Sequence, residues 1–82
     1  GAVTLHVKAK LPDTVLIHLR KILDAHTGDV PVYFSIEDVG GQRLIKSSSR
    51  VRFDSDLVRE LEEILGRGTV RVGDTNTGNN PL

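Results

Sequence analysis

The sequence predicts an α+β fold, a small two-layer sandwich whose elements follow the order β-α-β-β-α-β. Two observations predict it. Apolar and polar residues alternate in four segments, which is the pattern of half-buried strands. In two other segments apolar residues recur with the spacing of one helix face. Two such helices are expected to cover one face of a four-stranded sheet, and 82 residues suffice for only one domain of this kind.

The first strand and the first helix follow from a change of period near the N-terminus. Residues 3–10 alternate strictly, and Pro12, which lacks the N–H of a sheet ladder, ends the strand. Asp13 is a typical helix N-cap. We therefore expect a helix over residues 13–26, with Gly28 as its left-handed terminator. Its apolar stripe consists of Val15, Leu16, Leu19, Ile22 and Leu23.

A hairpin is expected after the second strand, which covers residues 30–37. A two-residue loop at 39–40 would place Phe34 opposite Ile45, and a loop shifted by one residue would place Ile36 there instead. Both alternatives turn the odd-numbered residues of the third strand toward the core, because side chains alternate along a strand.

The third strand is the most polar of the four. Its register leaves Leu44 on the outer face of the sheet. The residues expected to face the core are Ile45, Val51 and Phe53. Residues 47–49 are serines, which form strands poorly, so we expect a bulge or a break there.

Asp54 or Ser55 is expected to cap the second helix, and Gly66 is expected to end it. Its stripe consists of Leu57, Val58, Leu61, Ile64 and Leu65. A last short strand follows at residues 69–72, with Val70 and Val72 turned inward.

The folded domain is expected to cover residues 3–72. Residues 1–2 are interpreted as the remnant of a tag. Residues 73–82 show no apolar periodicity, so we expect a disordered tail there.

The element order is that of the split β-α-β arrangement of ferredoxin-like folds, with an antiparallel or mixed sheet. In that arrangement the third strand lies in the middle of the sheet. The polar residues 42–49 would suit an edge better. A variant sheet order, or a three-stranded core with an added edge strand, is therefore an alternative.

The composition argues against several function classes. Eleven basic residues balance eleven acidic ones, and a net charge of zero argues against a dedicated nucleic-acid binder. Without cysteine the chain has no disulfide, no thiolate metal site and no cysteine nucleophile. No apolar run approaches the roughly 18 residues of a membrane span, and we expect no signal peptide.

The sequence shows no constellation of residues for catalysis. The three histidines are His6, His18 and His26, and none has a second ligand at the spacing of a metal site. The serines at 47–49 lack the Gly-x-Ser-x-Gly elbow of a nucleophile. Glu60, Glu62 and Glu63 are interpreted as a solvated helix face. We therefore expect no catalytic residue, no metal ligand and no cofactor.

The sheet face that the helices leave open is the candidate binding surface. Tyr33 and Leu44 are expected on it, although a solvated strand needs no large apolar groups. Basic residues around such anchors suit an acidic protein partner, because charges at the rim of an interface steer the encounter. The candidate residues are His6, Lys8, Lys10, Tyr33, Leu44, Lys46 and Arg71.

Two stretches of the sequence are distinctive. Residues 22–34 read ILDAHTGDVPVYF, and residues 50–66 read RVRFDSDLVRELEEILG. Together they resemble the C-terminal domain of the bacterial replicative DNA polymerase III alpha subunit, with its helix ending in L..H.GD, its strand PVY and its later YRV and L...L..LLG. The resemblance covers about residues 3–72. It departs at Phe53, where that family often has a valine followed by an aspartate or proline.

The resemblance implies a non-catalytic interaction module of the replisome that binds the tau subunit of the clamp loader. It implies a cytoplasmic protein that acts in DNA replication. The charge balance and the lack of a long apolar run predict little or no direct nucleic-acid binding and no membrane contact. The parent polymerase, a nucleotidyltransferase, holds its catalytic metal ions in a palm domain outside this stretch. No catalytic residue is therefore carried over to this chain.

Two other functions stay open. Small-ligand-binding regulatory domains of the same element order resemble a strand followed by D-x-P-G-x-L, and residues 11–16, LPDTVL, contain the aspartate but not the glycine that lets a ligand reach the backbone. A weak nucleic-acid-binding module is the second alternative. The charge balance and the single tyrosine argue against it, because such modules stack bases on several aromatic side chains.

Overall fold

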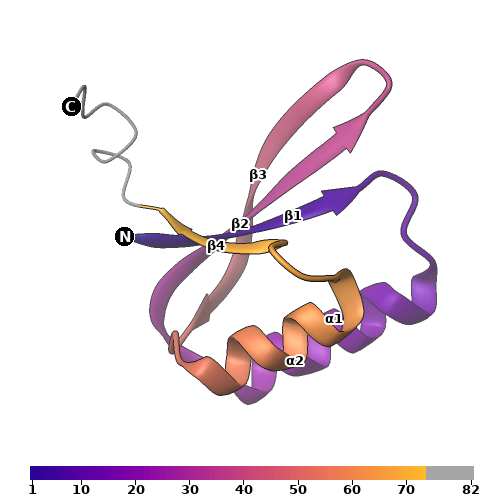
Figure 1. The fold of residues 1–82 in the computed structure, drawn as a ribbon. Helices are drawn as coiled ribbons and strands as arrows, with labels where there is room; N and C mark the ends of the chain where they lie inside the picture. The colour runs from indigo at the N-terminus through magenta and orange to yellow at the C-terminus, as the bar shows by residue number, and fades with distance from the viewer. Residues whose placement is uncertain (74–82) are drawn as a thin grey trace.

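The computed structural model describes residues 1–73, and it confirms the order β-α-β-β-α-β (Figure 1). The predicted tail lies outside the described residues except for Gly73, which belongs to the last strand. The elements are β1 (Ala2–Lys8), α1 (Asp13–Ala25), β2 (Thr27–Asp38), β3 (Gly41–Val51), α2 (Ser55–Leu65) and β4 (Val70–Gly73). Ala2 pairs with Gly73, so the sheet extends one residue beyond each end of the expected domain.

The four strands form one mixed sheet in the order β3-β2-β1-β4. β1 and β2 are parallel neighbours, while β3 and β4 run antiparallel to β2 and β1. The split of the ferredoxin-like arrangement is therefore not present, because no strand lies between the two parallel strands. The alternative order is the one observed, with the polar β3 at an edge and the apolar β1 in the interior of the sheet.

The hairpin has the first of the two predicted registers. Phe34 pairs with Ile45 and Asp38 pairs with Gly41, which leaves a two-residue loop. The expected irregularity at the serines is confirmed, because the register shifts where Ser47, Ser48 and Ser49 pass Val32. β3 continues through this bulge as far as Val51 instead of breaking.

The two helices differ in how they begin. Asp54, the first of the two predicted caps, caps α2, since its carboxylate accepts a hydrogen bond of 2.9 Å from the backbone N–H of Leu57. The cap predicted for α1 is wrong: Pro12 occupies the N-cap position, Asp13 already belongs to the helix, and no side chain caps it.

The helices also differ in how they end. Gly66 ends α2 as predicted, with a positive φ of 109°. Gly28 does not terminate α1, which ends at Ala25, and it lies within β2 instead. An added Cβ at Gly28 would lie 2.5 Å from the backbone nitrogen of Arg52. The glycine is therefore needed where the start of β2 passes close to the chain after β3.

The core lies between the sheet and the two helices, which cover one face of the sheet (Figure 1). Its buried side chains are Val3, Leu5, Val7, Leu19, Ile22, Leu23, Val32, Val51, Leu57 and Leu61. Four residues expected to face the core remain substantially exposed, and they are Leu16, Ile45, Phe53 and Val72. No helix in the described part of the chain is long and apolar enough to span a bilayer.

Candidate functional site

The outer face is the side of the sheet opposite the helices, and one row of side chains crosses it from edge to edge. Tyr33 of β2 pairs with Lys46 of β3 and with Thr4 of β1, and Thr4 pairs in turn with Arg71 of β4. Paired residues on neighbouring strands point to the same side of a sheet. The strand order thus places the only tyrosine between two basic residues of the two edge strands.

A second row runs beside the first. Leu44 pairs with Ser35, and Ser35 pairs with His6. Ser35 is buried between its two neighbours, while 67% of Leu44 is exposed on the open edge strand. Leu44 and the half-buried Tyr33 are therefore the accessible apolar groups of this part of the outer face.

A third row brings a carboxylate onto the outer face. Glu37 pairs with Lys8 on one side and with Gln42 on the other. The basic character of the face is therefore concentrated at Lys46, Arg71 and His6, and it is weaker near the hairpin loop. The alternation of β2 already placed Glu37 and Ser35 on the side of Tyr33, but only the observed sheet order shows which residues lie beside them.

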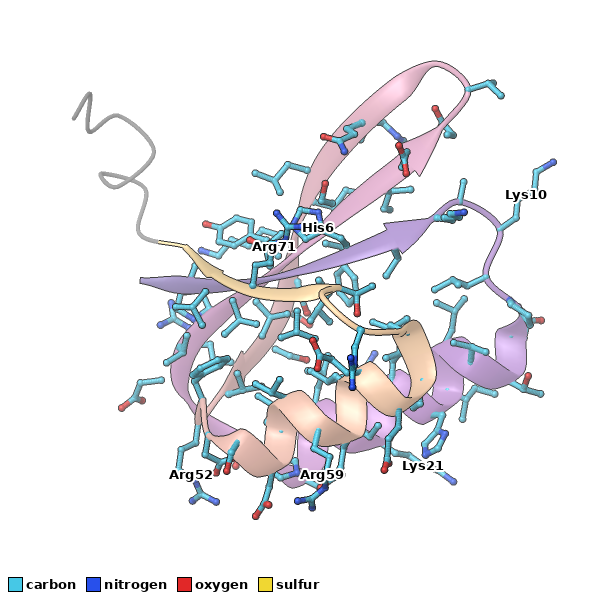
Figure 2. All side chains as sticks on the ribbon, viewed as in Figure 1. His6, Lys10, Lys21, Arg52, Arg59 and Arg71 are labelled. Carbon is cyan, nitrogen blue, oxygen red and sulfur yellow. The ribbon has the colours of Figure 1, made fainter. Side chains whose placement is uncertain are left out.

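Lys10 does not belong to the outer face, which corrects the prediction for this residue. β1 ends at Lys8, and Lys10 lies in a bend with a positive φ of 68°. Figure 2 shows its side chain pointing outward from the connection to α1, away from His6 and Arg71. The alternation of apolar and polar residues extends to Lys10, although β1 ends at Lys8, and this is why the sequence placed Lys10 on the outer face.

The edge of the sheet is open where β4 leaves β1. β4 pairs with β1 only as far as Leu5, and the last contact is a hydrogen bond of 2.7 Å from His6 N–H to the carbonyl oxygen of Thr69. A hollow of about 680 Å³ opens at this edge, and its wall combines His6 and Arg71 of the outer face with Val15 and Ile64 of the helices. Arg71 is held there by its Nε, which donates to the carbonyl oxygen of Gly68 at 3.2 Å.

The ion pairs of the described residues lie away from this surface. They are Arg20–Asp24, His26–Glu60, Arg52–Asp54 and Arg59–Asp56. Lys8, Lys46 and Arg71 take part in none of them. Their charges are therefore available to a partner.

His26 and Glu60 form a contact that the sequence analysis missed. His26 Nε2 lies 3.1 Å from Glu60 Oε2, and only 12% of the histidine side chain is exposed. This contact joins the end of α1 to α2, on the helical side of the sheet. Glu60 therefore does not lie on the solvated face expected for it, and the two residues are 34 positions apart, so no local pattern could have paired them.

The serine run has a structural role in the bulge. The hydroxyl oxygen of Ser47 accepts a hydrogen bond of 2.9 Å from the backbone N–H of Ser49. In residues 1–73 no group of three histidine, cysteine or acidic side chains is placed to hold a metal ion. His18 lies exposed on α1 and His6 lies on the outer face, so the histidines are dispersed over the fold.

The sequence matches no protein-family model and no curated protein. The resemblance to the polymerase III alpha subunit therefore remains a prediction from the motifs.

Proposed function

We propose that the chain is a non-catalytic protein-interaction module whose outer face binds an acidic protein surface. The resemblance to the polymerase III alpha subunit supports the tau subunit of a bacterial clamp loader as the partner, and a cytoplasmic C-terminal domain of a replicative polymerase as the identity of the module. One observation carries the proposal: Tyr33 lies between Lys46 and Arg71 in a single row across the sheet, and the exposed Leu44 lies on the next row.

The arrangement has the parts of a protein interface. Aromatic side chains anchor interfaces because they bury a large area with few rotatable bonds. The surrounding basic groups raise the rate of encounter with an acidic surface. Leu44 lies on an edge strand, where exposed leucine is a risk for aggregation unless a partner covers it.

The test is a double substitution on the outer face. Tyr33→Ala combined with Leu44→Ser should weaken binding of a clamp-loader tau subunit by about 5- to 30-fold, which corresponds to about 1–2 kcal/mol. Isothermal titration calorimetry measures the loss, and circular dichroism checks that the fold is intact. Both side chains lie outside the core, so the variant should fold.

Val39→Ser is the matched control, because Val39 is fully exposed at the hairpin loop and belongs to neither row. It should bind as the wild type does. Unchanged binding by the double variant would contradict the proposal. So would NMR shifts confined to the helical side when the partner is added.

A further inference from the structure

A second surface lies on the opposite side of the β2–β3 hairpin, where the helix layer does not reach. Phe34 and Ile36 of β2 and Ile45 of β3 point to the helical side of the sheet. The first half of α1 lies beside them, and between the two is a hollow of about 370 Å³. Figure 1 shows the hairpin extending away from the helices at this end of the sheet.

The hollow continues as a groove along α1. A second hollow of about 170 Å³ shares Leu16 and Phe34 with the first and reaches the serine bulge of β3. On α1 it is lined by Leu16, Leu19, Arg20 and Leu23. These positions are i, i+3, i+4 and i+7, which form one helix face about 10 Å long. The groove is therefore elongated, and it runs between α1 and β3.

The groove has accessible apolar side chains at its hairpin end, while Leu19 and Leu23 at its other end are buried. The exposed fraction is 48% for Leu16 and 42% for Ile45, although the sequence pattern assigned both to the core. A sheet face of this kind is normally buried against a helix layer. Here α1 packs against β3 near the buried Val51 but leaves the hairpin end of β3 around Ile45 uncovered, so the groove has the position that one further helix would fill.

The charges at the groove have one sign. Lys8, Lys10 and Arg43 line its first hollow, and no aspartate or glutamate of the described residues lines either hollow. None of these three basic residues forms an ion pair within residues 1–73. An occupant with acidic residues beside its apolar stripe would complement them.

We propose that this groove binds an amphipathic helix of a protein partner, with an apolar stripe toward Leu16 and Ile45 and acidic residues toward Lys10 and Arg43. A helix laid into an apolar groove is a recurrent mode of peptide recognition. This surface faces away from the outer face, because Ile45 and Leu44 are consecutive residues that point to opposite sides of β3. The groove and the outer face share Lys8 at the end of β1 and are otherwise formed by different side chains.

The test uses two synthetic peptides of about 15 residues, long enough to form a marginal helix in water. Both carry leucines at helical i, i+3, i+4 and i+7 spacing. One has glutamate at the flanking positions and the other has lysine there. Fluorescence anisotropy at moderate salt should show saturable binding of the acidic peptide and at least 10-fold weaker binding of the basic one. Amide NMR shifts should map to α1 and to the helical side of the hairpin.

Three variants test whether the peptide occupies the groove. Leu16→Gln with Ile45→Gln should weaken binding of the acidic peptide at least 10-fold, and Arg43→Glu should weaken it several-fold without touching the core. Ile17→Gln is the matched control on the residue next to Leu16, because Ile17 is 58% exposed and lines neither hollow, and it should leave peptide binding unchanged. Thermal unfolding followed by circular dichroism checks that each variant folds.

Four results would each overturn the proposal. They are no saturable binding of the acidic peptide, equal binding of both peptides, shifts confined to the outer face, and wild-type affinity of the Arg43→Glu variant. Sedimentation of the protein alone provides a further check. Self-association that Ile45→Gln abolishes would identify a second copy of the chain as the occupant and would likewise overturn the proposal.

Discussion

At the scale of single residues, the Asp54 carboxylate that caps α2 makes the stability of the fold depend on pH. The hydrogen bond from the backbone N–H of Leu57 lowers the pKa of the Asp54 carboxyl below its ordinary value of 3.8, and Arg52 acts in the same direction. The carboxylate is therefore more favourable in the folded chain than in the unfolded chain. Its stabilising effect is complete above pH 3.8 and is lost as the pH falls through the lowered pKa.

Asp54→Asn tests this effect, because asparagine keeps an N-cap acceptor but does not titrate. At neutral pH the wild type should be the more stable of the two, since the carboxylate also interacts favourably with the helix N-terminus. This advantage should shrink as the pH falls below about 4. Urea unfolding at a series of pH values measures the difference. A difference that stays constant down to about pH 2 would contradict the assigned cause.

Residue roles set by local geometry could be predicted from the sequence, and roles set by distant contacts could not. Asp54 precedes an amphipathic stripe by the spacing of a cap, and the structure confirms it. Asp13 has similar surroundings, but the helix starts one residue earlier, so its side chain lies within the first turn. The role of Gly28 depends on the backbone of Arg52, and no pattern near Gly28 indicates that contact.

At the scale of elements, the close approach of β2 to the end of β3 depends on Gly28. Gly28→Ala would place a Cβ 2.5 Å from the nitrogen and 2.7 Å from the Cα of Arg52, and both are backbone atoms that cannot rotate away. We expect a loss of roughly 1–3 kcal/mol in the free energy of unfolding, as for overpacked sites. Urea denaturation measures it.

Gly73→Ala is the matched control, because Gly73 also lies in a strand and an added Cβ there meets no atom within 4 Å. This variant should change stability by less than about 0.5 kcal/mol, as is usual for surface sites. If the two substitutions had equal effects, the close approach at Gly28 would not be the cause.

The hairpin shows which features of two paired strands can be predicted from the sequence. An even loop length fixes the parity of the pairing, so both predicted registers turned Ile45 toward the helical side, and the structure shows which of them is present, with Phe34 opposite Ile45. Parity also assigns a side chain to a face, and Ile45 does point to the helical side. It does not say whether that face is covered. Ile45 and Leu16 are exposed because no helix lies above β3 at this end of the sheet, and this depends on where α1 and α2 pack.

At the scale of the whole molecule, the order of elements is compatible with more than one order of strands. The polarity of residues 42–49 favoured an edge position, and the structure has β3 there. Consecutive parallel strands joined by a helix are often direct neighbours, as β1 and β2 are. The candidate face depended on this order. Alternation could group Tyr33 with Lys46 and Arg71, but only the sheet shows that they form one row.

The charge of the whole molecule leads to a prediction about DNA. Eleven basic and eleven acidic residues give a net charge of zero, so no long-range field attracts a polyanion. On the outer face Lys8, Lys46 and Arg71 could meet phosphates, but Glu37 lies beside Lys8. Few phosphates can be neutralised, so a labelled single strand should show no saturation in the low micromolar range at about 150 mM salt.

The salt dependence of any residual DNA binding distinguishes a nucleic-acid partner of the outer face from an acidic protein partner. Each neutralised phosphate of a single strand contributes a slope of about −0.7 to the plot of log K against log salt, so the slope here should be no steeper than about −2. Titrations between about 50 and 200 mM salt measure it by fluorescence anisotropy. Submicromolar affinity with a steeper slope, lost in a Tyr33→Ala variant, would make the outer face a nucleic-acid surface. An acidic protein partner would then no longer account for the basic row around Tyr33, because the same side chains would already be occupied by phosphates and a stacked base.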